Sequence, residues 1–303
     1  RPCQGRSRGF ESRFPLHFPP SVVIRGLSHL TGRRSQVVRQ RSAKPPFPGS
    51  NPGGASTSDA GSSPPLAIEA VGWTQHLRLL VLAPHPDDFD AVGVTMRFFH
   101  ERGHAIHVAV VSGSASGVLD SFCPGALAKA ALREEEQRAS LRFFGLPDSA
   151  LTFLRCPEDA GGDPAANTAN ENTIRACLAS ARPDIVVLPH GRDTNLGHQR
   201  VWSMFRRVGP GMPALLIRDP KTVELRTDLF LAFDEDRAEW KRQLLTHHRS
   251  QDHRNRELRG CGFDDRILAL NRQIAQELAL SEPYAEAFQF DFPNKGPGPF
   301  SGT

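Results

Sequence analysis

From residue 78 onward, short and continuous apolar runs alternate with longer amphipathic stretches, and this alternation most constrains the fold. The apolar runs occupy residues 79–83, 105–112, 151–155, 184–189 and 214–218. The amphipathic stretches occupy residues 91–101, 125–145, 170–182, 197–208, 235–251 and 264–280. Continuous apolar runs are typical of parallel strands buried on both faces, which need a crossover helix between them. The pattern therefore predicts a single α/β domain with a doubly wound, mostly parallel, Rossmann-like sheet and helices on both faces.

Residues 1–72 differ in composition from the rest of the chain. They are Arg-rich at first and then rich in Pro, Gly and Ser, with few aliphatic side chains. Such a segment buries too little apolar surface to offset its ordering entropy. We therefore expect a disordered tail, a domain at residues 73–292 and a flexible C-terminal tail at 293–303. The Arg and Ser content resembles an organelle transit peptide, but we favour upstream or vector-derived sequence, because clear amphipathic periodicity is absent and the chain begins at Arg1.

The basic charge of the chain lies in this N-terminal part. Residues 1–75 hold ten Lys or Arg and three Asp or Glu, and since the whole chain has a net charge of +4, the remainder has −3. This distribution does not favour a nucleic-acid partner. The five cysteines show no C-x-x-C spacing, which argues against a disulfide framework and a thiolate zinc site. No apolar run approaches the ~18 residues of a membrane span, so we expect a soluble, cytoplasmic protein.

Polar side chains crowd the end of the first apolar run. His85, Asp87 and Asp88 follow residues 79–83 within the segment APHPDD. Adjacent carboxylates are costly to crowd together unless positive charge lies between them. In a doubly wound sheet, ligands bind at the carboxyl ends of the strands, which is where this segment lies. A turn in which Asp87 or Asp88 caps the following helix is the structural alternative.

A second polar cluster follows the apolar run at residues 184–189. It contains His190, Asp193, Asn195 and His198. If the two strands are neighbours, His198 could join His85 and Asp88, and two imidazoles with one carboxylate suit Zn²⁺ and leave a fourth position for water. Zinc lowers the pKa of that water to about 7. Asp87, beside a ligand but pointing elsewhere, could then act as the general base.

Four ordered segments of the chain resemble the PIG-L/LmbE-like family of zinc-dependent N-deacetylases, which remove acetyl groups from N-acetylglucosamine units. The segments are APHPDD, LREEEQRASLRFFGLP, DTNLGH and KRQLLTHHRSQ, and the resemblance extends over residues 77–290. The resemblance implies that His85, Asp88 and His198 are the zinc ligands and that Asp87 is the general base.

The second cluster departs from the family pattern at two positions. Asn195 stands where many members have a histidine that contacts the carbonyl or the intermediate, and Gly197 stands where members commonly have Asp. Asn195 could donate its amide N–H to the oxyanion of the reaction. Asp193 could orient a metal ligand or bind a sugar hydroxyl.

Arg133 and His248 lie in the other two matching segments. Both are candidate substrate contacts, with a surface ion pair as the alternative for Arg133 and helix capping as the alternative for His248. The three glutamates at 134–136 are typical of a solvated helix face. Residues 113–126 and 156–168 are predicted to be the loops that set substrate specificity.

Together with the resemblance, these residues predict a zinc-dependent hydrolase of linear amides. It would deacetylate a small N-acetylglucosamine-like sugar or its conjugate, by attack of metal-bound water with Asp87 as the base. One alternative is a metal-dependent hydrolase of another amide or of a phosphoester, for which Arg192, Arg200 and Lys221 are candidate cations. The other is a non-catalytic, metal-containing sugar-binding module, which the spare carboxylate of Asp87 disfavours.

Overall fold

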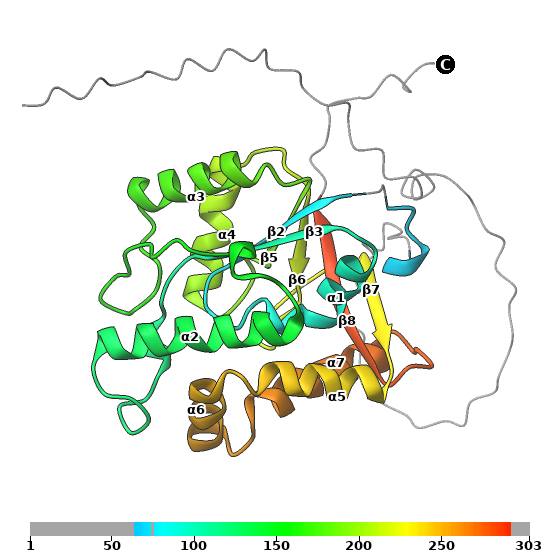
Figure 1. The fold of residues 1–303 in the computed structure, drawn as a ribbon. Helices are drawn as coiled ribbons and strands as arrows, with labels where there is room; N and C mark the ends of the chain where they lie inside the picture. The colour runs from blue at the N-terminus through cyan, green and yellow to red at the C-terminus, as the bar shows by residue number, and fades with distance from the viewer. Residues whose placement is uncertain (1–63, 74–75, 292–303) are drawn as a thin grey trace, which may run out of the picture.

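A computed structural model of the chain describes residues 64–73 and 76–291 (Figure 1). Within these residues, the strands are β1 (Leu66–Ala67), β2 (Arg78–Ala83), β3 (Ala105–Val110), β4 (Leu151–Phe153), β5 (Ile185–Pro189), β6 (Ala214–Ile217), β7 (Leu229–Phe233) and β8 (Tyr284–Asp291). The α-helices are α1 (Gly93–Glu101), α2 (Ala126–Phe144), α3 (Thr168–Ala181), α4 (Leu196–Val208), α5 (Glu235–Leu245), α6 (Arg249–Arg259) and α7 (Phe263–Glu277).

The strands form one sheet in the order β1-β7-β8-β6-β5-β2-β3-β4. Strand β2 pairs in parallel with β3 on one side and with β5 on the other. The chain winds outward from β2 through β3 to β4, and then returns to β5 and β6 on the opposite side. Only β8 runs antiparallel to its neighbours, β6 and β7. The predicted doubly wound, mostly parallel sheet is confirmed, and its winding direction changes between β2 and β5.

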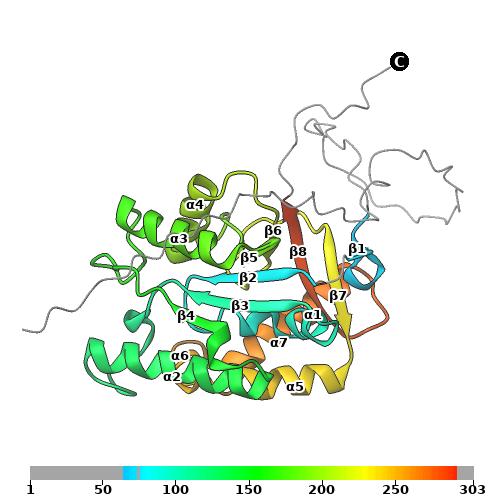
Figure 2. The same ribbon diagram turned by 45° about the horizontal axis from the view of Figure 1, so that its top comes forward.

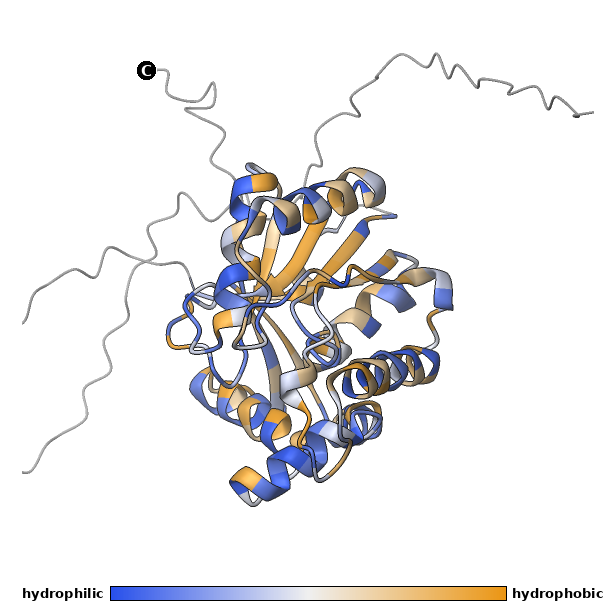
Figure 3. Ribbon diagram, turned by 90° about the vertical axis from the view of Figure 1, so that its left-hand side faces the viewer, coloured by the Kyte–Doolittle hydropathy of each residue, from blue (hydrophilic) through white to orange (hydrophobic). Residues whose placement is uncertain are grey.

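Helices cover both faces of the sheet, because successive residues of its central strands point to opposite sides. Val81 and its neighbours on one face pack against α1, α2, α5 and α7. Leu82 and its neighbours on the other face pack against α3 and α4. Figure 2 shows these two layers above and below the strands, and Figure 3 shows the apolar strands enclosed between helices with polar outer surfaces. None of the helices in the described residues is long and apolar enough to cross a membrane.

The C-terminal part of the fold differs from the sequence prediction in two respects. The amphipathic stretch at residues 235–251 is not one helix, since α5 ends at Leu245 and α6 begins at Arg249. The break is stabilised by tertiary contacts: His248 pairs with Asp90, and the backbone N–H of Ser250 donates to Glu136. Strands β7 and β8 were also not predicted.

The ordered domain begins before residue 73, so the expected boundary after residue 72 lies too late. Leu66 and Ala67 form β1, which pairs with β7. Ile68 is fully buried and Val71 nearly so. The indole of Trp73 donates to the Ile68 carbonyl at 2.8 Å. The tails expected at residues 1–63 and 293–303 lie outside the described residues.

Two truncations test this boundary. Removal of residues 1–72 is expected to lower the free energy of unfolding by about 2–5 kcal/mol, because it deletes β1 and the buried side chain of Ile68. Removal of residues 1–63 should change it by no more than about 0.5 kcal/mol. Urea unfolding of the two truncated chains and the full chain measures both effects. Equal values for the two truncations would show that residues 64–72 add nothing to the stability of the domain.

Candidate metal centre and active-site pocket

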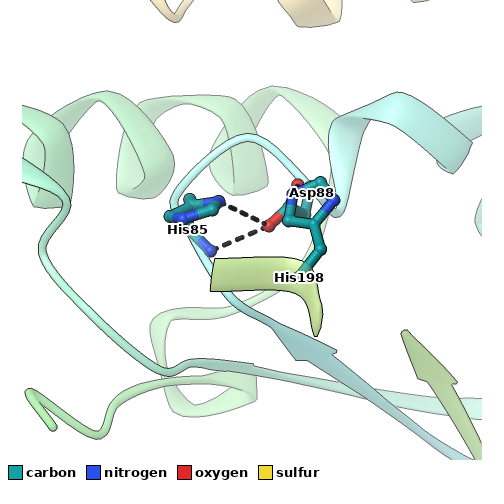
Figure 4. Close-up of side chains that lie close together, drawn as sticks. All are labelled: His85, Asp88 and His198. Atoms are coloured by element: carbon teal, nitrogen blue, oxygen red, sulfur yellow. Dashed lines mark hydrogen bonds and ion pairs between the residues drawn. The ribbon is translucent and has the colours of Figure 1, made fainter. Parts of the chain in front are cut away.

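The loop after β2 forms a tight turn closed by one of its own carboxylates. The backbone N–H of His85 donates to Asp88 Oδ2 at 2.8 Å, and His85 Nδ1 lies 3.4 Å from the same oxygen (Figure 4). The backbone N–H groups of Asp90 and Ala91 both donate to the Asp87 carbonyl, which begins the next helical segment. The side chains of His85 and Asp88 therefore lie together on one side of this turn.

His198 lies beside this turn and belongs to helix α4, which follows the neighbouring strand β5. Helix α4 begins two residues before His198, with Asn195 as its N-cap. His198 Nε2 lies 3.2 Å from Asp88 Oδ1, and His198 Nδ1 lies 3.1 Å from Asp193 Oδ2. Because β2 and β5 are neighbours in the sheet, the two polar loops meet at the point where the winding direction changes.

The electrostatics of these buried groups favour a cation. Burial is the largest influence on His198 and opposes its positive charge, but Asp88 and Asp193 outweigh it and raise the pKa of His198 to about 10. Burial likewise opposes charge on Asp88, yet the two histidines hold the pKa of Asp88 well below its usual range. The buried carboxylates of Asp88 and Asp193 thus stabilise a positive charge between them. A divalent metal ion would also supply such a charge.

His85, Asp88 and His198 fit a divalent metal ion in number, type and spacing. Their candidate ligand atoms all lie within 4.8 Å of one another, and all three side chains are buried. Two imidazoles and a carboxylate with one open position are a zinc ligand set. Asp193 fixes the ring of His198 through Nδ1, which leaves Nε2 for the metal, as is common for metal-binding histidines. This contact is one of the two roles expected for Asp193.

Asp87 points away from this trio, toward Arg133. Its carboxylate accepts a hydrogen bond of 2.8 Å from Arg133 Nη2, and its backbone N–H donates to Gln137 Oε1 at 3.0 Å. The φ angle of Asp87 is +118°, which is strained for a residue with a side chain. The strained backbone at Asp87 thus accompanies a turn in which the carboxylates of Asp87 and Asp88 have different partners.

Arg133 is not a surface residue. Its side chain is 2% exposed, and its guanidinium donates to the Pro86 carbonyl and to Ser114 Oγ as well as to Asp87. Glu136, expected on a solvated face, is also buried, and its carboxylate accepts two hydrogen bonds from Ser250. The surface interpretation is therefore wrong for both side chains.

His248 lies behind the loop after β2 rather than in the wall of the pocket. It is fully buried, and its Nε2 lies 2.7 Å from Asp90 Oδ2. Gln137 joins this pair to the loop, because its amide N–H donates to Asp90 while its oxygen accepts from the backbone of Asp87. His248 is thus placed to support Asp87, not to contact a substrate directly.

A pocket of about 270 Å³ opens beside the trio. His85, Asp87, Asp88, Arg133 and Asn195 line it, whereas Asp193, His198 and His248 do not. Both loops predicted to set specificity contribute to its lining, the first through Ser114, Ser116 and Gly117 and the second through Gly161, Gly162 and Asp163. This volume lies near the lower end of the range of roughly 300–1,000 Å³ for small-molecule sites.

Sequence reasoning missed several charged residues of this pocket. Asp219, in the loop after β6, lines the pocket and lies close to Asp193 and His198. Its position after a parallel strand was a usable signal, since the carboxyl ends of these strands share one edge of the sheet. The other missed residues are Arg254, Arg259 and Arg266, on α6 and α7.

Comparison with known proteins finds a family model that matches the part of the chain with the two polar loops. Residues 80–208 match the model of the PIG-L family, described as GlcNAc-PI de-N-acetylase. This match covers most of β2 through α4 and includes His85, Asp88 and His198. A comparison of the whole chain with curated proteins finds no match.

Solved structures similar to this chain include deacetylases and a hydratase. N,N′-diacetylchitobiose deacetylase from Pyrococcus horikoshii is 17% identical with a TM-score of 0.59, over 74% of this chain and 87% of that chain. A triple mutant of the deacetylase of teicoplanin biosynthesis is 16% identical with a TM-score of 0.58, over 72% and 100%. The 4-carboxy-2-hydroxymuconate hydratase from Pseudomonas putida is 19% identical with a TM-score of 0.54, over 74% and 99%. Such identities establish the fold, and the fold alone does not fix the reaction.

The two departures of this chain from the pattern of the PIG-L family have clear structural consequences. The Asn195 oxygen accepts from the backbone N–H of Gly197 at 2.9 Å, so the amide nitrogen is the end left to donate. A Cβ at Gly197 would lie 2.6 Å from His85 Nε2 and 2.9 Å from Cε1 of the same ring. The absence of a side chain at 197 thus gives His85 its position, and Asp193 rather than residue 197 orients His198.

Gly197→Ala tests this close approach. The added methyl group should displace the His85 ring and weaken zinc binding by roughly 10–100-fold, the usual cost of disturbing the support of a ligand. Titration of the metal-free protein with zinc measures the affinity. Leu196→Ala is the matched control, because Leu196 is the preceding residue of α4 and is 42% exposed. Equal zinc affinity in both variants would contradict the role given to Gly197.

Proposed function

We propose that this chain is a zinc-dependent N-deacetylase of an N-acetylated sugar, similar to N-acetylglucosamine, or of its conjugate. The observation that carries the proposal is the buried trio of His85, Asp88 and His198 beside Asp87, at the edge of one pocket. The family description and the deacetylases among the similar structures support the same reaction. The domain responsible would extend from β1 to β8.

His85, Asp88 and His198 would hold the zinc ion, and hydrogen bonds support two of them, Asp88 and His198. When bound, zinc would lower the pKa of a water molecule and polarise the acetamide carbonyl. Asp88 is fixed by the His85 backbone, and His198 is fixed by Asp193. These supports orient the ligands before the metal arrives.

Asp87 would handle the proton of the attacking water. Its carboxylate lines the pocket without belonging to the ligand trio, so it can accept a proton and return it to the leaving amine. Arg133 holds the carboxylate in one orientation from the buried side. Asn195, whose amide nitrogen is left to donate, would bind the oxyanion that develops on the carbonyl.

Zinc content and release of amine from N-acetylglucosamine conjugates test the proposal together. We expect one zinc ion per chain, loss of amine release on chelation, and recovery when zinc returns. His198→Ala should lose zinc and activity, whereas His190→Ala, in the same loop but outside the trio, should retain zinc.

Other outcomes would favour the alternatives. Hydrolysis of phosphoesters instead of acetamides would indicate a different metal-dependent hydrolase. A chain that holds zinc and binds sugars without releasing amine would indicate a binding module. Zinc binding that survives His198→Ala unchanged would refute the ligand set.

A further inference from the structure

The backbone of Asp87 is strained and depends on support from the groups around it. Its φ angle of +118° lies in a region that residues with a side chain rarely adopt. Such conformations persist only where the surrounding structure holds them, and they cluster at functional sites. The groups that hold Asp87 in this conformation therefore also decide where the candidate base lies.

Gln137, on helix α2, holds the N–H side of Asp87. Its Oε1 accepts a hydrogen bond of 3.0 Å from the backbone N–H of Asp87. The side chain of Gln137 is fully buried, and its contact with Asp87 is partly buried. An N–H group that loses its acceptor in such a place is costly, so the hydrogen bond favours the strained conformation over the alternatives.

Asp90 fixes which way round the amide of Gln137 lies. Gln137 Nε2 donates to Asp90 Oδ2 at 3.0 Å. Asp90 is fully buried, its Oδ1 accepts from Ser140 Oγ, and its Oδ2 also lies 2.7 Å from His248 Nε2. A carboxylate accepts hydrogen bonds and does not donate them, so the amide must turn its NH₂ group to Asp90. The amide oxygen is then left for the N–H of Asp87.

The C=O side of Asp87 is held by the next turn of the chain. The backbone N–H groups of Asp90 and Ala91 donate to the Asp87 carbonyl at 3.1 and 3.2 Å. The N–H and C=O groups of Asp87 are thus both fixed, and together they determine the direction of its Cα–Cβ bond. In that direction the carboxylate reaches Arg133 Nη2 and the pocket.

We propose that Gln137 is a positioning residue, which holds the backbone of Asp87 and thereby directs its carboxylate into the pocket. The inference rests on the proposed function, in which Asp87 accepts the proton of the attacking water. Gln137 lies outside the lining of the pocket. In the described part of the chain, its amide bonds to Asp87 and Asp90 and to none of the three candidate metal ligands. Gln137 would therefore act only through Asp87.

Gln137→Leu tests the inference kinetically, because leucine has a similar size but offers no acceptor to the N–H of Asp87. We expect kcat for amine release from the methyl glycoside of N-acetylglucosamine to fall by about 10–100-fold, since a misplacement of about 1 Å can cost that much. KM and zinc content should stay unchanged, because Gln137 contacts neither the pocket nor the metal ligands. An unchanged kcat would overturn the inference.

Ser140→Ala is the matched control. Ser140 lies about one turn further along α2, is fully buried and donates to Asp90 Oδ1, whereas Gln137 donates to Oδ2. Its loss removes one buried hydrogen bond of Asp90 and should reduce stability accordingly. It should leave kcat unchanged, because the N–H of Asp87 keeps its acceptor. Equal losses of kcat in the two variants would indicate a general effect of packing around Asp90 and would contradict the inference.

A double-mutant cycle with Asp87→Asn separates positioning from a purely structural effect. If Gln137 acts only through the carboxylate of Asp87, Gln137→Leu should not lower kcat further once that carboxylate is absent. A structural effect would instead multiply the two losses. Multiplied losses would show that Gln137 acts independently of the candidate base, which would also refute the inference.

Hydrogen exchange tests the inference without any turnover. Nuclear magnetic resonance of the isotope-labelled full chain follows the amide proton of Asp87. We expect this proton to exchange at least about tenfold faster in Gln137→Leu than in the wild type or in Ser140→Ala, the size of one lost hydrogen bond. Equal rates in the three proteins would mean that Gln137 does not hold Asp87. A wild type that releases no amine would refute the proposed function alone, because the exchange rates still decide whether Gln137 positions Asp87.

Discussion

Asp87→Asn is expected to lower kcat by about 10²–10⁴-fold while the protein keeps its zinc, because general base catalysis typically contributes that much. Asn is nearly isosteric with Asp but cannot accept a proton at neutral pH. Asp87 lines the pocket without belonging to the ligand trio, so metal content should not change. Steady-state kinetics and metal analysis on the same preparation measure both effects.

The surroundings of Asp87 decide how this experiment is run. Arg133 is almost fully buried, and Asp87 is its carboxylate partner in the described part of the chain. Asp87→Asn therefore removes the counterion of a buried cation and should also reduce stability. The kinetics belong at a temperature well below the unfolding midpoint, where a full zinc content shows that the site is folded.

Asp88→Asn provides the contrast, since the two carboxylates are neighbours with different partners. Asp88 contacts both histidines of the trio, so its loss should empty the metal site and abolish activity together. If Asp87→Asn loses zinc while Asp88→Asn retains it, then Asp87 is the metal ligand and Asp88 is the base. Full activity in both variants would refute the roles of base and metal ligand given to these two carboxylates.

The central sheet could be predicted because each of its strands is recognisable from its own apolar residues. Strands β2, β3, β5 and β6 are nearly continuous apolar runs, as expected for strands buried on both faces. Strand β1 has only two residues, and the apolar run of β7 has no helix before it to suggest a parallel pair. In β8, Glu286 interrupts the apolar pattern, so the sequence does not indicate a buried strand there. Sequence periodicity does not identify strands that are very short or that contain a buried charge.

The residues of the candidate site also differ in whether the sequence could place them together. His85, Asp88 and His198 could be grouped from sequence, because each follows a buried strand and parallel strands end at the same edge of the sheet. Arg254 could not, because it lies in a helix whose many arginines look alike in sequence. Only the packing of α6 against α2 and α7 separates the arginines that face the pocket from those that pair on the surface.

The KRQLLTHHRSQ segment connects several elements around the pocket. Ser250 binds Glu136, and Gln251 donates to the Gly117 carbonyl. His248 binds Asp90 at the base of the loop after β2. These contacts join α6 and its N-cap to the loop after β2, to α2 and to Gly117, and Gln251 itself lines the pocket. Lys241, the first residue of the segment, belongs to the same framework.

Glu286→Gln is expected to destabilise the protein by about 3–5 kcal/mol, the usual cost of leaving one member of a buried ion pair without the other. The Lys241 ammonium is fully buried, 2.7 Å from Glu286 Oε1. It also donates to the Ala91 carbonyl and to Asn271 Oδ1. Gln would retain a hydrogen-bond acceptor but would leave this ammonium without a counterion. For a domain of this size, the loss corresponds to a decrease in Tm of roughly 6–20 °C.

Glu101→Gln is the matched control, because Glu101 pairs with Arg97 at the same distance of 2.7 Å but at the surface. That pair should contribute less than about 1 kcal/mol. The double variant Lys241→Met with Glu286→Gln should recover part of the loss, since it removes both buried charges. If Glu286→Gln costs no more than Glu101→Gln, burial does not strengthen the Lys241 pair.

The same pair should also affect the metal centre. Glu286 accepts the backbone N–H groups of Val94 and Thr95 at the start of α1, which has no side-chain cap of its own. Lys241 holds the Ala91 carbonyl, and the Ala91 N–H donates to the carbonyl of Asp87. The ion pair thus anchors the helical segment that follows the metal-binding turn. Glu286→Gln should therefore weaken zinc binding at temperatures where the rest of the fold is intact, whereas Glu101→Gln should not, and parallel zinc titrations of the two variants measure the difference.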